Sequence, residues 1–339
     1  MNDADVIQVE GKKTQSTKVK QLLFKIGPLL ALFLISLTLT LTTDKFLQYD
    51  NIMNIMKQTS VNGLVSAGML IILITGGIDL AVGSTLAFSI SLMGVTLRNG
   101  YDNVLLLVII CLAGGTFIGW LNGIALTKLR LPHPFISTLG MQNIARGVAL
   151  FITAAVPISG FPRTLQYPGS ATINGFPVSF IIVIVIFAVF HVFLNHTVLG
   201  RKIYSVGGNK EAAALAGINV DRVLTIAYII SGFMAAFAGL ILVGRTNSAF
   251  PLAGLNYELD AIASCIIGGA SFFGGKGTIW GTLIGALTIS VIRNGLNLLG
   301  APSDLQMIAI GSVIILAVYT DVIRVGVEAR SKRLAAAKE

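Results

Sequence analysis

Long apolar runs separated by short polar connections make up most of the chain. Several of these runs are shorter than the ~20 residues that a helix perpendicular to a membrane requires, so we expect some helices to be broken or only partly embedded. The pattern predicts an all-α integral membrane protein with about ten transmembrane helices. The predicted runs are Ile26–Thr42, Val61–Thr75, Ala81–Leu97, Asn103–Leu126, Phe135–Ala155, Val178–Leu194, Val223–Val243, Leu259–Phe273, Thr278–Leu298 and Asp304–Thr320.

The first apolar run is predicted to be retained as a span. A signal peptide has a small-residue cleavage site after a short apolar core, whereas Ile26–Thr42 is followed by Thr43, Asp44 and Lys45. We therefore expect a cytoplasmic N-terminus. The predicted organisation is a basic cytoplasmic tail at 1–25, a transmembrane domain at 26–321 with a cytoplasmic loop at 199–222, and a second basic cytoplasmic tail at 322–339.

Positive charge supports this orientation. With an inside start and about ten crossings, Lys128, Lys276 and the 199–222 loop share the cytoplasmic side with the C-terminal tail, as positive charge does in membrane proteins. An alternative with about eight spans stays open, in which weak segments around Phe135–Ala155 or Leu259–Phe273 are re-entrant.

The composition agrees with a membrane protein. Hydrophobic residues make up 54% and charged residues 12% of the chain, and the mean hydropathy is +0.83, whereas soluble domains are about 25% charged. The net charge of +9 lies mostly in the termini and short loops, which indicates membrane topology and argues against nucleic-acid binding. Cys111 and Cys265 stand inside apolar runs, so neither a disulfide framework nor a metal-ligand spacing is indicated.

The longest charged interruption between apolar runs is Leu199–Arg222, and its residues predict one short helix. Asn209 is a favourable N-cap, Glu211 places a negative charge in the first turn, and Gly217 suits the C-terminus. The body, residues 212–216, is almost entirely alanine and too short to be stable alone. We therefore expect either a plug that presses into a groove on another protein or an ordinary capped loop helix.

A glycine-rich stretch, Ile74–Phe88, follows one of the predicted spans. Gly76 and Gly77 permit a tight turn where the span ends. Asp79 is placed to cap the next helix, and Gly83 allows close packing. We interpret Asp79 as a structural cap or a gate element, and not as catalytic, since no histidine, cysteine or second carboxylate accompanies it nearby.

A second glycine-rich stretch spans residues 257–287. Placing residues 76–77 over Gly268 and Gly269 also places Gly83 over Gly275, which is a weak indication of two related halves.

The sequence GGKG at 274–277 resembles the end of a phosphate-binding loop. However, Ala270 stands where that loop requires a glycine, and Gly277 where it requires serine or threonine. We therefore predict no ATP site in this chain, so that any ATP is used by another subunit.

The connection between the fifth and sixth runs is rich in Gly, Pro, Ser and Thr, and parity places it outside. It is interpreted either as a plain surface loop or as part of a docking surface for an extracytoplasmic partner.

Five segments together carry a family resemblance: ITGGIDLAVGS, LGRKIYSVGGNKEAAALAGINV, NYELDAIASCIIGG, GGKGTIWGTLIGAL and IRNGLNLLG. In this order and spacing, they resemble the permeases of ribose-type monosaccharide importers in the ATP-binding-cassette superfamily. The resemblance runs from Asn51 to Thr320. The Glu-Ala-Ala and Gly signature of the family's coupling helix, which seats in the ATPase subunit, matches Glu211, Ala212, Ala213 and Gly217.

The resemblance implies the permease subunit of a monosaccharide importer in the bacterial inner membrane. Its expected partners are a second permease copy, ATP-binding subunits beneath, an extracytoplasmic sugar-binding protein above, the monosaccharide and the lipid bilayer, with no nucleic acid. ATP and magnesium are then held by the partner ATPase and this chain holds no cofactor and is not itself an enzyme. A homodimer is expected, and a heterodimer stays open.

Polar residues within or near the apolar runs are candidates for the translocation path. Ionisable members are functional-site hypotheses by default, although interhelical hydrogen bonding is our preferred interpretation for most of them. Arg146 and Arg293 are expected to pair with Asp260 or Asp304 at an interface. The candidates are Asn62, Asn122, Gln142, Asn143, Arg146, Arg293, Asn294 and Asn297.

Other functions compete with this one. Within the same superfamily, the cargo is alternatively a nucleoside, a signalling furanosyl compound or a branched amino acid. From a different class, an autonomous secondary transporter or channel should show paired acidic residues in the spans, and these are scarce. An intramembrane enzyme is disfavoured because the sequence offers no nucleophile and base pair and no metal set.

Overall fold

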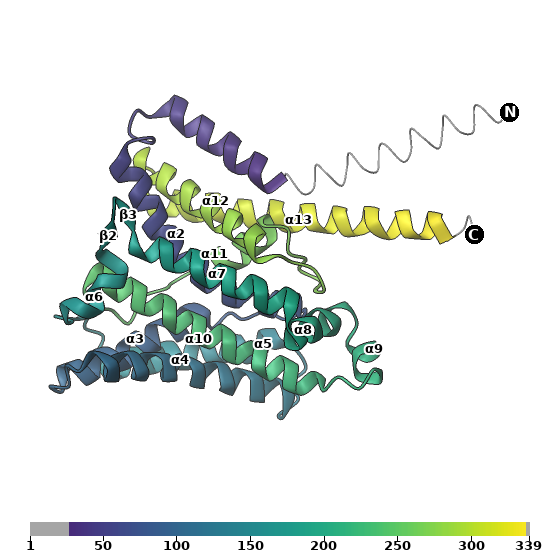
Figure 1. Cartoon of the computed structure of the whole chain (residues 1–339), viewed down its shortest axis with the longest axis horizontal. Coiled ribbons are helices and arrows are strands. Elements are labelled where there is room, and N and C mark those ends of the chain that lie inside the picture. The colour runs from purple at the N-terminus through teal and green to yellow at the C-terminus, as the bar shows by residue number, and fades with distance from the viewer. Residues whose placement is uncertain (1–26, 337–339) are drawn as a thin grey trace.

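The computed structural model describes residues 27–336. Its long helices lie side by side and run roughly from left to right in Figure 1. The predicted tail at 1–25 and the last three residues of the second tail, 337–339, lie outside the described residues. The helices are Gly27–Thr42, α2 (Tyr49–Ile74), α3 (Val82–Arg98), α4 (Val104–Thr127), α5 (Pro134–Thr153), α6 (Arg163–Ser170), α7 (Val178–His196), α8 (Val198–Gly208), α9 (Lys210–Leu215), α10 (Val220–Thr246), α11 (Tyr257–Ile267), α12 (Ile279–Leu298) and α13 (Ser303–Ala336).

Within the described residues, 7 helices are long and apolar enough to cross a membrane by length and composition, namely α2, α4, α5, α7, α10, α12 and α13. Gly27–Thr42 and α3 are apolar but shorter, and α11 has only 11 residues. The predicted apolar runs therefore correspond to helices of the structure, some of them short as expected. The count of about ten crossings and the orientation of the termini stay predictions.

Helix α13 continues past Thr320 to Ala336, and another large difference from the predicted runs is at α2, which begins at Tyr49 rather than at Val61. Its first turns carry polar side chains that a hydropathy pattern excludes. These side chains have partners on other helices: Asn51 exchanges hydrogen bonds with Asn294 of α12, and Asn54 accepts one from Arg245 of α10. Because these tertiary contacts satisfy the polar groups, the helix continues past the apolar run.

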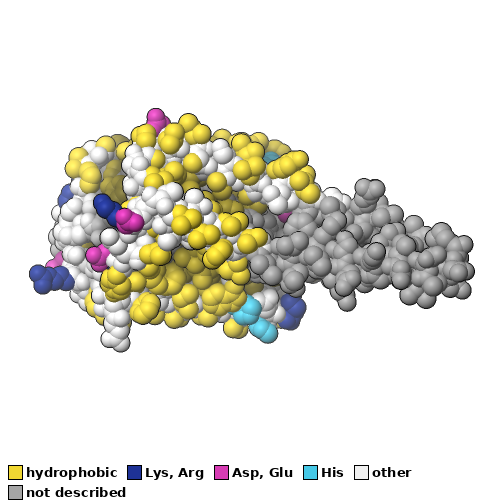
Figure 2. Space-filling view, turned by 90° about the horizontal axis from the view of Figure 1, so that it is seen from above, with side chains coloured by type: hydrophobic (Ala, Val, Ile, Leu, Met, Phe, Trp, Pro, Cys, Tyr) yellow, Lys and Arg dark blue, Asp and Glu magenta, His cyan; other side chains and the backbone are white. Residues whose placement is uncertain are grey.

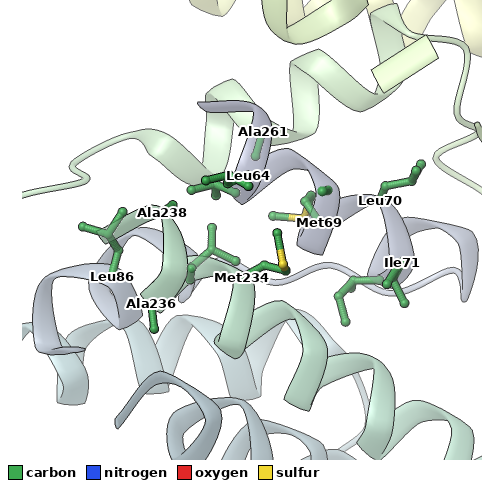
Figure 3. Packing of buried hydrophobic residues seen from close by; sticks show 14 of the residues in the cluster. Leu64, Met69, Leu70, Ile71, Leu86, Met234, Ala236, Ala238 and Ala261 are labelled. Atoms are coloured by element: carbon green, nitrogen blue, oxygen red, sulfur yellow. The ribbon is translucent and has the colours of Figure 1, made fainter. Parts of the chain in front are cut away.

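Helices α2 and α10 form the centre of the bundle. In an apolar stretch of 18 residues from each helix, 83% of the residues are buried in α2 and 72% in α10, against 22% in α5 and 11% in α13. Figure 3 shows Leu64 and Met69 of α2 facing Met234 of α10 in the buried hydrophobic cluster. The outer helices consequently present apolar side chains at the surface, and Figure 2 shows hydrophobic side chains over much of the middle of the described surface in that view.

Close approach between α4 and α10 depends on glycine. A Cβ atom on Gly119 would collide with the carbonyl of Tyr228, and one on Gly232 with the carbonyl of Gly115. Small residues at such positions let two membrane helices pack backbone against backbone, where van der Waals contact replaces the absent hydrophobic driving force.

Two short antiparallel sheets lie at one end of the bundle. β1 (Ile158–Ser159) pairs with β4 (Ser248–Ala249), and β2 (Thr172–Ile173) pairs with β3 (Phe176–Pro177). The labelled strands β2 and β3 and helix α6 lie at the end of the bundle opposite α8 and α9 (Figure 1). The Gly- and Pro-rich connection between α5 and α7 is thus a folded unit, with α6 packed on α10 through Gly169.

Candidate functional site

The predicted short helix is α9, and a further helix, α8, precedes it in the 199–222 loop. Asn209 is the N-cap of α9, since its Oδ1 accepts a hydrogen bond of 2.8 Å from the Ala212 N–H. Glu211 is exposed in the first turn. Gly217 follows the helix with φ at +80°, in the left-handed region that favours glycine. Each of these three residues therefore takes the position in the helix that its residue type predicts.

One face of α9 has no covering among the described residues. Ala213 is 5% exposed and packs against the bundle, whereas Leu215 is 91% exposed. Ala212 and Ala214 are exposed as well. A small apolar surface at the end of the bundle suits insertion into a groove on another protein.

The loop is fixed to the bundle by a junction of glycines at the end of α8. Gly207 lies so close to the carbonyl of Ile74, the last residue of α2, that a Cβ atom there would collide with it. The same carbonyl accepts a 2.8 Å hydrogen bond from the Gly275 N–H, and the Tyr204 hydroxyl donates one of 2.7 Å to the Gly277 carbonyl. The end of α8 is therefore in direct contact with the end of α2 and with the turn between α11 and α12.

Asp321 of α13 holds the other side of that turn. Its Oδ2 accepts hydrogen bonds from the Ser271 hydroxyl at 3.1 Å and from the Phe272 N–H at 3.0 Å. Asp321 was not among the predicted site residues. Its only sequence signal is an acidic residue directly after an apolar run.

Asp79 is buried between α2 and α3, outside both helices. Its carboxylate accepts a hydrogen bond of 3.0 Å from the Ala81 N–H and one of 2.8 Å from the Ser231 hydroxyl on α10. Burial raises the pKa of this carboxyl to about 6, while the bonds from Ser231 and Ala81 oppose the rise. Asp79 does not cap α3 as predicted: Ala81 is the N-cap residue, and Asp79 instead ties the connection to α10.

The helix ends at Gly76 and Gly269 share one geometry. Gly76 follows α2 with φ at +73°, and Gly269 follows α11 with φ at +90°. The equivalent positions are thus Gly76 and Gly269, one residue away from the predicted match of Gly76 with Gly268. With this register, Gly83 of α3 and Gly275 of the α11–α12 turn are not equivalent, and the relation between the two halves stays a prediction.

Gly83 and Gly268 are instead points of close helix contact. A Cβ atom on Gly83 would collide with the Gly254 carbonyl, and one on Gly268 with the Gly281 carbonyl. Gly77 is less crowded, with the Tyr228 hydroxyl 3.3 Å from its Cβ position. Because glycine has no side chain, these positions let neighbouring backbone segments pack closely.

Of the two arginines predicted to form ion pairs, one does so and the other does not. Arg293 of α12 forms a bidentate ion pair with Asp260 of α11, through Nε at 2.9 Å and Nη2 at 2.8 Å. Arg146 of α5 pairs with neither Asp260 nor Asp304: its Nη1 donates to the carbonyls of Pro251 and Ala253 at 2.7 and 2.6 Å. Arg146 therefore braces the connection between α10 and α11.

The Asp260–Arg293 pair borders a cavity of about 300 Å³ between α2, α10, α11 and α12. Asn62 and Asn297 of the predicted set also line it, and sequence reasoning missed Gln58, Arg245 and Tyr257. These three residues stand at the ends of predicted runs or beyond them, where hydropathy carries no information about which side chains converge.

The remaining polar candidates do not join this cavity. Asn294 bonds Asn51 of α2. Asn143 is exposed on α5 and bonds only its own helix, at the Leu139 carbonyl. Asn122 is 1% exposed, and its side-chain amide finds no hydrogen-bond partner among the residues that the structure describes. These three are therefore interhelical, surface and buried positions respectively.

Metal and thiol chemistry find no support in the described part of the chain. No group of His, Cys, Asp and Glu there is arranged to hold a metal ion. Cys111 and Cys265 are both free and fully buried.

Comparison with known proteins gives a consistent result. Residues 51–318 match the family model described as branched-chain amino acid transport system / permease component. The ribose import permease protein of Bacillus subtilis is 41% identical over 93% of this chain and 97% of its own length. The ribose import permease protein of Escherichia coli K12 is 42% identical over 86% and 92%. The D-allose transport system permease protein of Escherichia coli K12 is 39% identical over 83% and 86%. No solved structure matches the chain.

Proposed function

The chain belongs to the family described as branched-chain amino acid transport system / permease component, and from that premise we propose that it is the permease subunit of an ATP-binding-cassette importer for a monosaccharide. It is a multi-pass membrane protein. The observation that carries the proposal is the likeness, over most of both chains, to proteins named as ribose and D-allose permeases. We place it in the bacterial inner membrane.

The proposed topology has about ten crossings and both termini in the cytoplasm. The crossings are the 7 long apolar helices together with Gly27–Thr42, α3 and the short α11. In this orientation α8 and α9 face the cytoplasm, and the strands β1 to β4 face outward. Lys128, Arg201 and Arg222 then lie on the cytoplasmic side. The division into a transmembrane domain at 26–321 and a tail at 322–339 is part of the proposal.

Helix α9 is proposed as the contact with an ATP-binding subunit. Its exposed Leu215 and Glu211 would enter a groove of that subunit, which would hold ATP and magnesium. When the partner subunits close on ATP, α9 would shift. The shift would reach α2 and the α11–α12 turn through Gly207 and Gly275, because backbone atoms of the neighbouring segments lie directly against these glycines. The cargo path would open in response.

The outward end is proposed to receive a sugar-binding protein. There the folded unit of α6 and β1 to β3 offers a rigid surface with β4 from the α10–α11 connection. A second copy of the chain is proposed to complete the path, since the resemblance to importer permeases implies a dimer.

Reconstitution tests the proposal. The full chain is placed in liposomes with the ATP-binding subunit and the sugar-binding protein from the same cells, and uptake of radiolabelled D-ribose is measured. We expect uptake only with ATP at the α9 side and the binding protein at the other. Uptake of L-leucine instead of D-ribose would favour the branched amino acid alternative, and uptake driven by an ion gradient without ATP would replace the importer with a secondary transporter.

A matched pair of variants tests whether α9 is required for ATP-dependent uptake. Leu215→Asp should abolish ATP-dependent uptake, because it puts a charge into the proposed apolar contact. Leu129→Asp makes the same change at a leucine that is 69% exposed, in the α4–α5 connection at the same end of the bundle, and should retain uptake. Equal activity of the two variants would remove α9 from the coupling contact.

A further inference from the structure

The cavity bordered by Asp260 and Arg293 has the properties of a small-molecule site. Its volume of about 300 Å³ lies at the lower end of the range of roughly 300–1,000 Å³ for ligand pockets, as suits a small ligand. Its polar lining comes from α2 and from three consecutive helices, α10, α11 and α12, that are distant from α2 in sequence. The polar lining residues include Gln58, Asn62, Arg245, Asp260, Arg293 and Asn297.

The ion pair leaves hydrogen-bonding capacity toward the cavity. The Asp260 side chain is 5% exposed, whereas that of Arg293 is 31% exposed. The pair uses Nε and Nη2 of the guanidinium, so Nη1 stays outside it. Each carboxylate oxygen of Asp260 accepts one bond from Arg293 and retains a further lone pair. The pair thus presents a donor and an acceptor side by side.

The amides around the pair are also available. The side chain of Gln58 makes no hydrogen bond with any residue that the structure describes, although it lies half-buried in the lining. Asn62 donates one bond of 3.1 Å to the Ser264 hydroxyl, and its Oδ1 has only a long contact of 3.4 Å with the Ser66 hydroxyl. Polar groups inside a membrane protein are costly unless they pair with one another or with a ligand.

The hydrogen-bonding groups of the lining suit a ligand rich in hydroxyl groups. Asp260 and Arg293 neutralise each other, whereas the Arg245 guanidinium keeps its positive charge and donates a hydrogen bond of 3.0 Å to the neutral amide of Asn54 on α2. A hydroxyl group both donates and accepts, so adjacent hydroxyls of one ring match the adjacent acceptor and donor of the pair. Tyr257 and Leu255 supply apolar wall area for the C–H faces of such a ring.

The cavity lies at the end of the bundle away from α9. It is built by the first half of α2, the last turn of α10, the first turn of α11 and the second half of α12. These segments lie toward the end that carries β2, β3 and α6 in Figure 1. In the proposed orientation this is the side on which cargo arrives.

We propose that this cavity binds one monosaccharide, with Asp260 and Arg293 engaging neighbouring hydroxyl groups and Asn62 and Gln58 a further one. The choice of ligand rests on the proposed function. The permease then recognises its cargo itself, so that sugar specificity is not confined to a soluble binding protein.

Cysteine protection tests this site in the full chain without any partner subunit. Gln58→Cys is labelled with a maleimide in detergent, where the fully buried Cys111 and Cys265 do not compete. Titrated D-ribose should slow labelling along a saturable curve, about tenfold when its concentration is about ten times the dissociation constant. Sucrose at equal viscosity controls for the solvent, and Leu215→Cys on α9 should label at a rate that D-ribose leaves unchanged.

A second pair of variants tests whether protection from labelling depends on the side chains that line the cavity. In the Gln58→Cys background, Asn62→Leu should raise the half-protecting D-ribose concentration about fivefold to tenfold, because one hydrogen bond is lost. Asn143→Leu makes the same change on the surface of α5 and should leave that concentration unchanged.

Three results would overturn the site. The first is that D-ribose gives no saturable protection. The second is protection by D-ribose 5-phosphate but not by D-ribose, which would indicate an anion site. The third is failure of Gln58→Cys to label without sugar, which would show that the cavity is closed to solvent. Each leaves the importer proposal standing, because labelling requires neither ATP nor uptake. Loss of ATP-dependent uptake in reconstitution would in turn leave the protection result unaffected.

Discussion

The backbone N–H of Gly275 donates a hydrogen bond of 2.8 Å to the carbonyl oxygen of Ile74, which joins the turn after α11 to the end of α2. Gly207, at the end of α8, lies against the same carbonyl. One oxygen atom therefore connects the α8–α9 loop with two helices that line the polar cavity at the far end of the bundle. This contact is a direct structural link between the loop of the proposed ATPase contact and helices that line the proposed sugar site.

Gly207→Ala should damage this junction, whereas Gly208→Ala should not. The added methyl group at Gly207 collides with backbone, while a Cβ at Gly208 meets nothing within 4 Å. We expect Gly207→Ala to lower the free energy of unfolding by about 1–3 kcal/mol and to reduce ATP-dependent uptake. Thermal unfolding in detergent and uptake in liposomes measure the two effects. Identical behaviour of both variants would mean that the junction is loose.

Charge reversal at Glu211 should separate the chain from its ATPase without unfolding it. Glu211 is exposed and makes no hydrogen bond through its side chain to any described residue, so Glu211→Lys should insert and fold normally. We expect an ATP-binding subunit to copurify from native membranes with the wild-type chain and to be lost from the variant. Asp102→Lys reverses an exposed charge in the α3–α4 connection, at the opposite end of the bundle, and should retain the subunit. Copurification with Glu211→Lys at the wild-type level would contradict the coupling role.

Gly217→Val should give the same uncoupling by a different route. Gly217 has φ at +80°, which a β-branched residue adopts only with strain, so the end of α9 should shift. Normal uptake by both Glu211→Lys and Gly217→Val would remove the coupling assignment. Membrane insertion of each variant is checked by its yield in the solubilised membrane fraction.

Asp79 should make stability depend on pH in the acidic range. Its pKa is raised by burial from 3.8 to about 6, so the folded chain binds more protons than the unfolded chain between these values. The stabilisation from the protonated carboxyl is fully present below about pH 4 and is lost as pH rises through about 6, for a total of about 3 kcal/mol. Asp79→Asn should flatten this slope, and its amide retains partners in Ala81 and Ser231.

Unfolding temperatures in detergent from pH 4 to 7 measure this effect as the difference between wild type and Asp79→Asn. Asp102→Asn, at an exposed site, serves as the control and should follow the wild-type curve. Parallel curves for wild type and Asp79→Asn would show that the carboxyl does not titrate in this range.

The Asp260–Arg293 pair should be replaceable for folding but not for transport. Asp260→Ala leaves the guanidinium unpaired and should cost about 2 to 3 kcal/mol, less than for a fully buried pair, because 31% of the Arg293 side chain is exposed. The double variant Asp260→Leu with Arg293→Met should recover stability, since apolar residues of similar volume often replace buried pairs. It should still lack D-ribose uptake. Full uptake by the double variant would assign the pair a purely structural role.

The apolar runs and the caps of α9 could be predicted because each depends on neighbours in sequence. The runs at 103–126, 178–194 and 278–298 differ from α4, α7 and α12 by no more than a few residues at either end. Asn209 caps the helix that follows it because its side chain reaches the Ala212 N–H three residues on. Composition likewise determined the class of protein, since bilayer insertion depends on summed hydropathy.

Tertiary structure decided where α2 begins, what Asp79 bonds and which polar side chains meet around the cavity. Asp260 was predicted to have an arginine partner, but only packing selected Arg293 over Arg146. Asn51 and Asn294 stand 243 residues apart, and no local pattern links them. Hydropathy reports how much of a helix prefers lipid, whereas the bonding of its polar groups depends on which helices it touches, and that is fixed only when the bundle packs.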